Sequence, residues 1–236
     1  MELSNVVFIE TSILIASSMG GSTDLDKIKH EKYDASIHLI RKACKKSICI
    51  TTYNIDKLAK ETLDKAVEKK CNETGNYDIF ADALNIIRRK YIENIRTIDI
   101  LGVIPNEVDK LFEEVLEMYR QLQNKALEEP QKIETYDSRF IGLARELNKH
   151  EKIKHKKLFN KMVDKPLIPD DHDIEHLSEA ICIKRNKFNK DIFFIFVSLD
   201  NHFIGTYQPY DIIPPEIEKR YNIKCLSPER VHEFLK

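Results

Sequence analysis

Acidic residues follow two apolar segments that lie near opposite ends of the chain. Glu10 comes directly after Val6-Val7-Phe8-Ile9, and Asp200 stands three residues beyond the apolar segment 192–197. Asp173 lies near the start of the helical pattern that leads into that second segment. Ligand sites of parallel α/β sheets lie outside the carboxyl ends of the strands. We therefore expect these three carboxylates to meet at one edge of a sheet.

Carboxylates that are brought together repel one another unless a cation lies between them. Taken singly, Asp200 is also explained as a turn former and Asp173 as a first-turn helix acid. Their shared position favours a metal site. Mg²⁺ takes oxygen ligands, keeps several waters and uses one or two direct carboxylates, so a loose acidic group suits Mg²⁺ or Mn²⁺. Two such ions about 3.5–4 Å apart can promote an in-line displacement at phosphorus.

Short apolar segments alternate with helical patterns along the chain. This order predicts a three-layer α/β/α sandwich with a mostly parallel central sheet, because continuous apolar strands are buried on both faces. A length of 236 residues favours one enlarged domain, 1–236, with a helical and lysine-rich elaboration at 126–165. Strands are expected at 6–9, 47–51 and 192–197, weaker ones at 96–101 and 223–226, and helices at 34–45, 54–70, 106–125, 173–184 and 228–235.

Composition argues against several classes of function. Lysine plus arginine is 38 against 39 acidic residues, a net charge of −1, so any nucleic-acid contact needs a local basic patch. The six glycines form no dinucleotide-binding, Walker or nucleophile-elbow motif. The five cysteines form no C-x-x-C pair, and the sequence shows neither a basic leader nor an apolar run of membrane length. We expect a cytoplasmic protein with reduced thiols and no membrane contact.

Four segments resemble parts of PIN domains. Val-Val-Phe-Ile-Glu-Thr-Ser-Ile-Leu-Ile is similar to the opening strand of that family, with its acid, its hydroxyl residues and an apolar helix start. Asp-Ile-Glu-His-Leu-Ser-Glu-Ala resembles the second signature, and Phe-Val-Ser-Leu-Asp-Asn-His-Phe resembles the third. The last of the four segments also resembles the final strand and helix of PIN domains. The segments are 6–15, 173–180, 196–203 and 222–235, and the resemblance covers about 1–70 and 168–236.

The resemblance implies an endoribonuclease that depends on Mg²⁺ or Mn²⁺. It carries the first, third and fourth acids of the family onto Glu10, Asp173 and Asp200. Glu10 departs from the usual aspartate. The hydroxyl positions beside these acids fall on Thr11, Ser12 and Ser198.

The second acid of the family lies on the helix after the second strand. Counting from Ile50 places it at Lys57, which cannot bind a metal. Glu61 lies one turn further on a similar face, so we assign it as the fourth ligand. Asp56 and Asp171 are reserve candidates.

Two other functions stay open. The departures at Glu10 and Lys57 are compatible with a PIN-like protein that binds RNA, or acts as a scaffold, without cutting. His172-Asp-Ile-Glu-His176 matches H-x-x-E-H, the inverted zinc-peptidase pattern, in which the histidines bind zinc and Glu175 is the base.

A lysine-rich segment offers the local basic patch. Residues 149–165 hold seven lysines against one glutamate and one aspartate. A solvated loop is the ordinary explanation. The functional one is phosphate contact by Lys154, Lys156 and Lys157 beside the acids. The expected partner is single-stranded RNA, and the sequence is also compatible with a homodimer and with an antitoxin or ribosomal partner.

Overall fold

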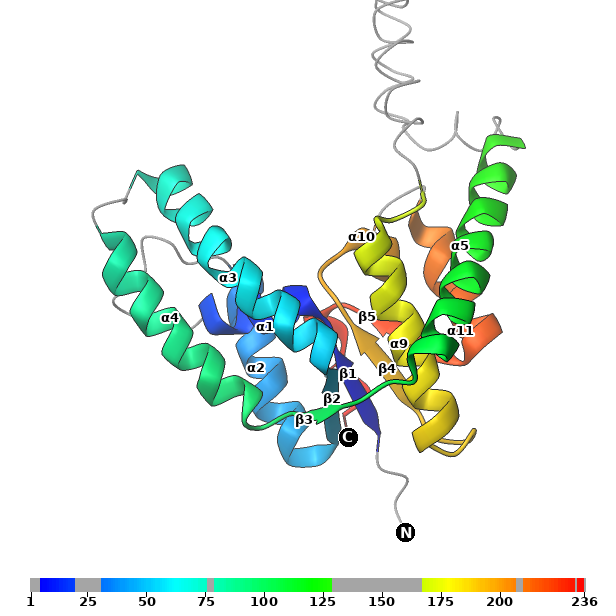
Figure 1. Ribbon diagram of the computed structural model, residues 1–236, viewed down its shortest axis with the longest axis horizontal. Helices are drawn as coiled ribbons and strands as arrows, with labels where there is room; N and C mark the ends of the chain where they lie inside the picture. Colours follow the sequence, from blue (N-terminus) through cyan, green and yellow to red (C-terminus); the bar gives the residue numbers. More distant parts are fainter. Residues whose placement is uncertain are drawn as a thin grey trace, which may run out of the picture.

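Five parallel strands form one sheet in the order β3-β2-β1-β4-β5 (Figure 1). The computed structural model describes residues 5–19, 31–75, 79–128, 167–206, 210–231 and 233–235. The strands are β1 (Val6–Ile9), β2 (Ile48–Thr52), β3 (Asp99–Leu101), β4 (Phe194–Val197) and β5 (Ile223–Leu226). The predicted α/β fold is confirmed, and every strand pair of the described sheet is parallel.

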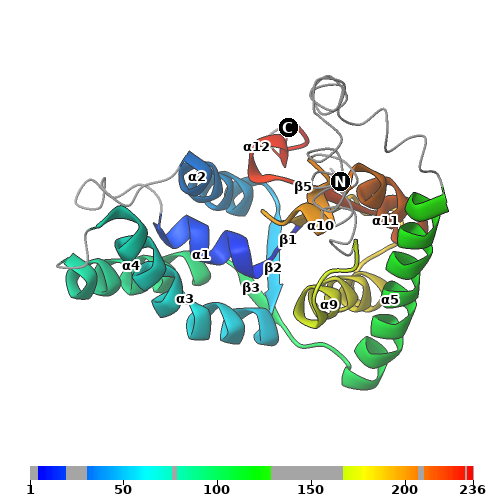
Figure 2. The same ribbon diagram turned by 90° about the horizontal axis from the view of Figure 1, so that it is seen from above.

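Helices cover both faces of the sheet, as the view from above shows (Figure 2). One face carries α1 (Thr11–Met19), α2 (Glu31–Lys46), α3 (Tyr53–Thr74) and α4 (Phe80–Ile95). The other carries α5 (Pro105–Glu128), α9 (Asp171–Lys187) and α11 (Ile213–Tyr221). Shorter turns of helix are α10 (Asn201–Ile204), η3 (Tyr210–Ile212) and α12 (Pro228–Val231). None of the described helices is long and apolar enough to cross a membrane.

The expected elements match the structure apart from their ends. The strands expected at 47–51, 96–101 and 192–197 are shifted or shortened, and the helix expected at 228–235 ends at Val231. Helices α4 and α11 were not expected. The signal for α4 was present, because its buried residues Ala83, Ile87 and Tyr91 are spaced four apart.

The elaboration expected at 126–165 lies mostly outside the described residues. Its first three residues continue α5, which extends to Glu128. Lys154, Lys156 and Lys157 all lie outside the described part of the chain. The division of the chain into one domain with an insertion therefore stays a prediction.

The central strand β1 joins the core to the edge where the acids lie. All four of its residues are buried, and the ring of Phe8 stacks on Phe196 of β4 with centroids 5.4 Å apart. Ile9 pairs with Val197 in the parallel register. The backbone N–H of Glu10 then donates to the carbonyl of Val197 at 3.2 Å. This register places the residues that follow β1 and β4 beside one another at the carboxyl edge.

Gly205 ends the short helix that follows β4, and we predict that Gly205→Ala is strongly destabilising. Its φ of 53° is left-handed, and a Cβ there would approach the carbonyl oxygen of Tyr210 to 2.7 Å and the ring of Pro214 to 2.8 Å. Backbone strain and this overlap together are expected to lower the free energy of unfolding by about 2–3 kcal/mol.

Gly75 is the matched control for this substitution. It also has a left-handed φ, of 69°, but a Cβ there meets nothing within 4 Å. Gly75→Ala should therefore cost only the backbone term, about 1 kcal/mol. Urea denaturation compares the two variants, and equal losses would contradict a tight contact at Gly205.

Candidate metal centre

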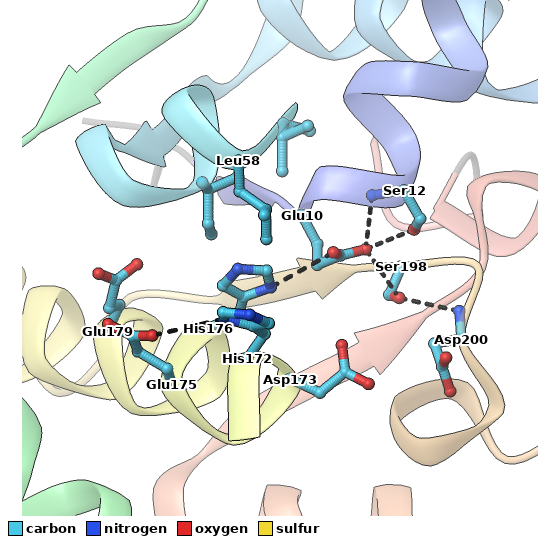
Figure 3. A network of polar contacts seen from close by, with 12 residues as sticks. Glu10, Ser12, Leu58, His172, Asp173, Glu175, His176, Glu179, Ser198 and Asp200 are labelled. Carbon is cyan, nitrogen blue, oxygen red and sulfur yellow. Dashed lines mark hydrogen bonds and ion pairs between the residues drawn. The ribbon is translucent and has the colours of Figure 1, made fainter. Parts of the chain in front are cut away.

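Glu10 stands at the junction of β1 and α1, at the carboxyl edge of the sheet (Figure 3). Its Oε2 accepts hydrogen bonds from the backbone N–H of Ser12 at 2.9 Å, from the Ser12 hydroxyl, and from the Ser198 hydroxyl at 3.2 Å. Ser12 also connects the two strands, since its Oγ accepts from the N–H of Leu199 at 3.0 Å. These contacts hold Oε2 in place, and Oε1 points toward His176 of α9 (Figure 3).

Helix α9 presents two side chains to this carboxylate. Asp170 caps the helix, and its side chain accepts from the N–H of Asp173 at 3.0 Å. Residues three apart lie on the same helix face, so Asp173 and His176 both face the sheet edge. The ligand atoms of Glu10, Asp173 and His176 all lie within 4.8 Å of one another.

Asp200 extends this cluster on the side of Asp173, from the loop after β4. Its Oδ1 accepts from the N–H of His202 at 2.8 Å and lies 2.8 Å from Nδ1 of the same residue. Its own N–H donates to the Ser198 hydroxyl at 2.9 Å. Asp173, Asp200 and His202 form a second group whose ligand atoms lie within 4.8 Å. Asp173 belongs to both groups, and we call Glu10, Asp173, His176 and Asp200 the acidic centre.

The pKa values of Asp173, Asp200 and His176 are shifted by their surroundings. Desolvation, followed by repulsion from Asp200 and Glu10, raises the pKa of Asp173 to about 7. Desolvation also acts to raise the pKa of Asp200, but hydrogen bonds from His202 outweigh it and lower that pKa. Burial opposes protonation of His176, yet the nearby carboxylates, Glu10 first, raise its pKa.

The residues present fit a divalent cation. Among the described residues, no lysine or arginine forms an ion pair with Glu10, Asp173 or Asp200. Nδ1 of His176 is buried and has no hydrogen-bond partner within the described chain, although Oε1 of Glu10 is only 3.4 Å away. Buried polar atoms are rarely left without a partner. A metal ion held by these side chains would supply the missing partner and offset the carboxylate repulsion.

The structure brings together most of the predicted site residues. Glu10, Asp173 and Asp200 meet at the expected edge, and Ser12 and Ser198 contact Glu10. Thr11 is buried beside them, and its hydroxyl has no hydrogen-bond partner among the described residues.

The predicted fourth ligand lies elsewhere. The Glu61 side chain is 60% exposed and lies 3.9 Å from Lys57, and it is in neither acidic group. On α3 the side chain that points toward His176 and Glu10 is Leu58 (Figure 3). Helical residues advance about 100° per position, so a count one residue out selects a different face.

The reserve acids also lie outside both acidic groups. Asp56 is buried but accepts from the Tyr91 hydroxyl at 2.6 Å and pairs with Lys60 at 2.5 Å. Asp171 is exposed in the first turn of α9. Asp56 therefore has a structural explanation, and the exposed Asp171 is suited as a control for substitutions of Asp173.

The two histidines of the H-x-x-E-H pattern have different surroundings. His172 is 68% exposed and lies 4.0 Å from Glu175, and neither residue belongs to the acidic groups. His176 is buried against Glu10. His176 was predicted as a ligand only within the peptidase pattern, although its spacing of three from Asp173 is the signal that both face the same site.

Glu179 is a further buried carboxylate near the site, and it was not among the predicted site residues. Glu179 has no exposed surface and accepts from the Thr52 hydroxyl and from the Asn54 amide, each at 2.5 Å. These bonds attach the start of α3 to α9, three residues beyond His176. Glu179 thereby fixes where α3 lies relative to the acidic centre.

Asp173 makes the stability of the metal-free protein depend on pH. The pKa of Asp173 in the fold, about 7, is above its ordinary 3.8, so the folded state loses stability as pH rises through this interval. Asp173→Asn removes this penalty. Each pKa unit corresponds to about 1.4 kcal/mol, and solvent around the partly buried carboxyl reduces the effect. In EDTA, the variant should therefore gain about 2–4 kcal/mol over wild type at pH 8 and less than about 1 kcal/mol at pH 4.

Denaturant unfolding across this pH range measures the difference between the two proteins. Asp171→Asn, two residues away and exposed, should follow the wild-type curve with a small constant offset. A difference between Asp173→Asn and wild type that does not change with pH would contradict the proposed repulsion.

Comparison with known proteins assigns no family to this geometry. No protein-family model matches the chain, and no curated protein or solved structure shows significant similarity to it. The strand order and the acidic centre therefore carry the functional interpretation.

Proposed function

We propose that this chain is a PIN-like, metal-dependent endoribonuclease that hydrolyses phosphodiester bonds at the acidic centre. One observation carries the proposal: the carboxylates that follow β1 and begin α9 lie around a buried imidazole nitrogen without a hydrogen-bond partner in the described chain, and the second of them also groups with the carboxylate that follows β4. A parallel α/β sheet places its ligand site at this edge. The choice of RNA as substrate rests on the resemblance of segments 6–15, 173–180 and 196–203 to PIN domains.

Each residue has a distinct part in the proposed reaction. A divalent cation, Mg²⁺ or Mn²⁺, supplies charge neutralisation at the phosphate and a more acidic water. Glu10 and Asp173 hold the cation, and Ser12 and Ser198 keep the Glu10 carboxylate oriented. Asp200 has the more accessible carboxylate, at 42% exposed against 5% for Glu10, so we assign it to orient the attacking water and accept its proton.

The chemistry is a simple hydrolysis. The water oxygen bonds to phosphorus, one phosphorus–oxygen ester bond breaks, and the proton passes to the leaving oxygen. The products are a phosphate monoester and a hydroxyl, and no further reactant is needed.

The proposal is tested with a labelled, mixed-sequence single-stranded RNA. Cleavage by wild type and by Asp200→Asn is compared in Mn²⁺, in Mg²⁺ and in EDTA. Metal-dependent products that disappear in the variant support both the activity and its site. Products that persist in Asp200→Asn, or in EDTA, would contradict the proposal.

A binding protein without activity is the second candidate, and two observations favour it. His176 lies 3.4 Å from Glu10, where a protonated imidazole would neutralise the carboxylate in place of a metal. Leu58 faces the centre from α3, where no carboxylate is supplied (Figure 3). RNA binding that is unaffected by metal, together with no cleavage under any condition, would favour this candidate over the nuclease.

A further inference from the structure

We propose that His176 binds the cation through Nδ1 and makes the acidic centre select Mn²⁺ over Mg²⁺. This inference deepens the proposed function, because it concerns the cation of the same centre and rests on that centre binding metal. In this inference His176 is the additional ligand that the sequence had assigned to the carboxylate of Glu61.

The position of His176 matches that of a ligand. Its ring is buried, its Nδ1 lies 3.4 Å from Oε1 of Glu10, and that nitrogen has no hydrogen-bond partner among the described residues. Adjacent ligands of a six-coordinate ion with bonds of about 2.1 Å lie about 3 Å apart. A shift of a few tenths of an ångström therefore brings both atoms into one coordination sphere.

The imidazole of His176 is the nitrogen ligand available beside Oε1 of Glu10. Oε2 of Glu10 already accepts three hydrogen bonds from serines, so Oε1 is the oxygen free to coordinate. The neighbouring side chain from α3 is that of Leu58, which has no donor atom (Figure 3). The ligand set is then Glu10 Oε1, one Asp173 oxygen and His176 Nδ1.

A nitrogen ligand changes which metal the centre prefers. Mg²⁺ is a hard cation that is bound mainly by oxygen, whereas first-row transition ions accept imidazole readily. Mn²⁺ binds both carboxylate and imidazole, so it gains from His176 and Mg²⁺ gains little.

His202 is not equivalent to His176, although it lies in the second acidic group. Its Nδ1 lies 2.8 Å from Oδ1 of Asp200, in contact with a carboxylate that can accept its proton. Coordination through that nitrogen would break the contact. The experiment therefore treats His202 as the main competitor and His172, which is exposed, as the neutral control.

The test uses the full chain and MnCl₂ alone at pH 8, without RNA. Electron spin-echo modulation detects a nitrogen bonded to Mn²⁺. We expect ¹⁴N modulation in wild type, in His172→Gln and in His202→Gln, and its loss in His176→Gln. Its absence from wild type, or its loss in His202→Gln but not in His176→Gln, would overturn the proposal.

Affinity provides the second measurement. Titration calorimetry should give at least about tenfold weaker Mn²⁺ binding for His176→Gln, with Mg²⁺ binding changed less than about threefold. Equal losses for the two metals would overturn the selectivity. Should His176→Gln fail to fold, the double variant His172→Gln/His202→Gln replaces it. The ¹⁴N modulation should persist in this double variant, and its loss would overturn the proposal.

The outcomes separate this inference from the proposed function. Tight Mn²⁺ binding without nitrogen modulation rejects the His176 ligand and leaves the nuclease standing. Nitrogen-bound Mn²⁺ without RNA cleavage supports His176 and rejects the nuclease. No metal binding rejects both.

Discussion

Asp173→Asn is expected to reduce Mn²⁺-dependent RNA cleavage by about a thousandfold or more. Asp173 is the one residue shared by the two acidic groups, so its loss removes a ligand and the centre of the carboxylate cluster together. The substitution keeps the size of the side chain and removes its charge. Single-turnover cleavage of a defined RNA, at saturating and at limiting Mn²⁺, measures the loss.

Asp171→Asn is the matched control for this prediction. It makes the same chemical change two residues away on the same helix, where the carboxylate is exposed and outside both acidic groups. Its cleavage rate should stay within about twofold of wild type. Comparable losses in Asp171→Asn and Asp173→Asn would show that cleavage does not depend on the acidic centre.

Phe8→Ala is expected to cause the largest loss of stability, about 3–5 kcal/mol. Phe8 has no exposed surface, lies on the central strand and stacks on Phe196. Its truncation leaves a cavity beneath the paired residues Ile9 and Val197, which place Glu10 beside Ser198. Chemical denaturation in EDTA measures the effect apart from any metal.

Ile92 provides the comparison for Phe8. It is a large apolar residue of α4 that is 49% exposed, so Ile92→Ala should cost well under 1 kcal/mol. A loss for Phe8→Ala below about 2 kcal/mol would contradict a tightly packed centre of the sheet.

The fold was largely predictable from the sequence because the central strands β1 and β4 are buried along their whole length. Segment 6–9 matches β1, since it is short and wholly apolar and is bounded by polar residues. Segment 223–226 matches β5, although Lys224 interrupts its apolar residues and made it a weaker prediction. The three acids were predictable for the same reason, because they stand at or near the ends of such elements. Nothing more than strand direction was needed to bring them to one edge.

The remainder of the site depends on rotation about helix axes and on tertiary contacts. Glu61 was selected by counting along α3, but the rotation of that helix presents Leu58 to the centre (Figure 3). That rotation is fixed by Thr52 and Asn54 bonding to Glu179, a contact between residues about 125 positions apart. The spacing of three from Asp173 indicates the helix face of His176, but only the packing of α9 shows that this face lies against Glu10 and that His172 stays exposed.

The most direct test of the acidic centre is a crystal structure of the wild-type protein grown at pH 8 with MnCl₂, with data collected for the anomalous signal of manganese. We expect an anomalous peak bonded to Glu10 Oε1, an Asp173 oxygen and Nδ1 of His176, with Asp200 beside it. A centre without manganese at millimolar concentration, with His176 bonded directly to Glu10, would contradict it. So would manganese bound only by exposed side chains such as Asp171 or His172.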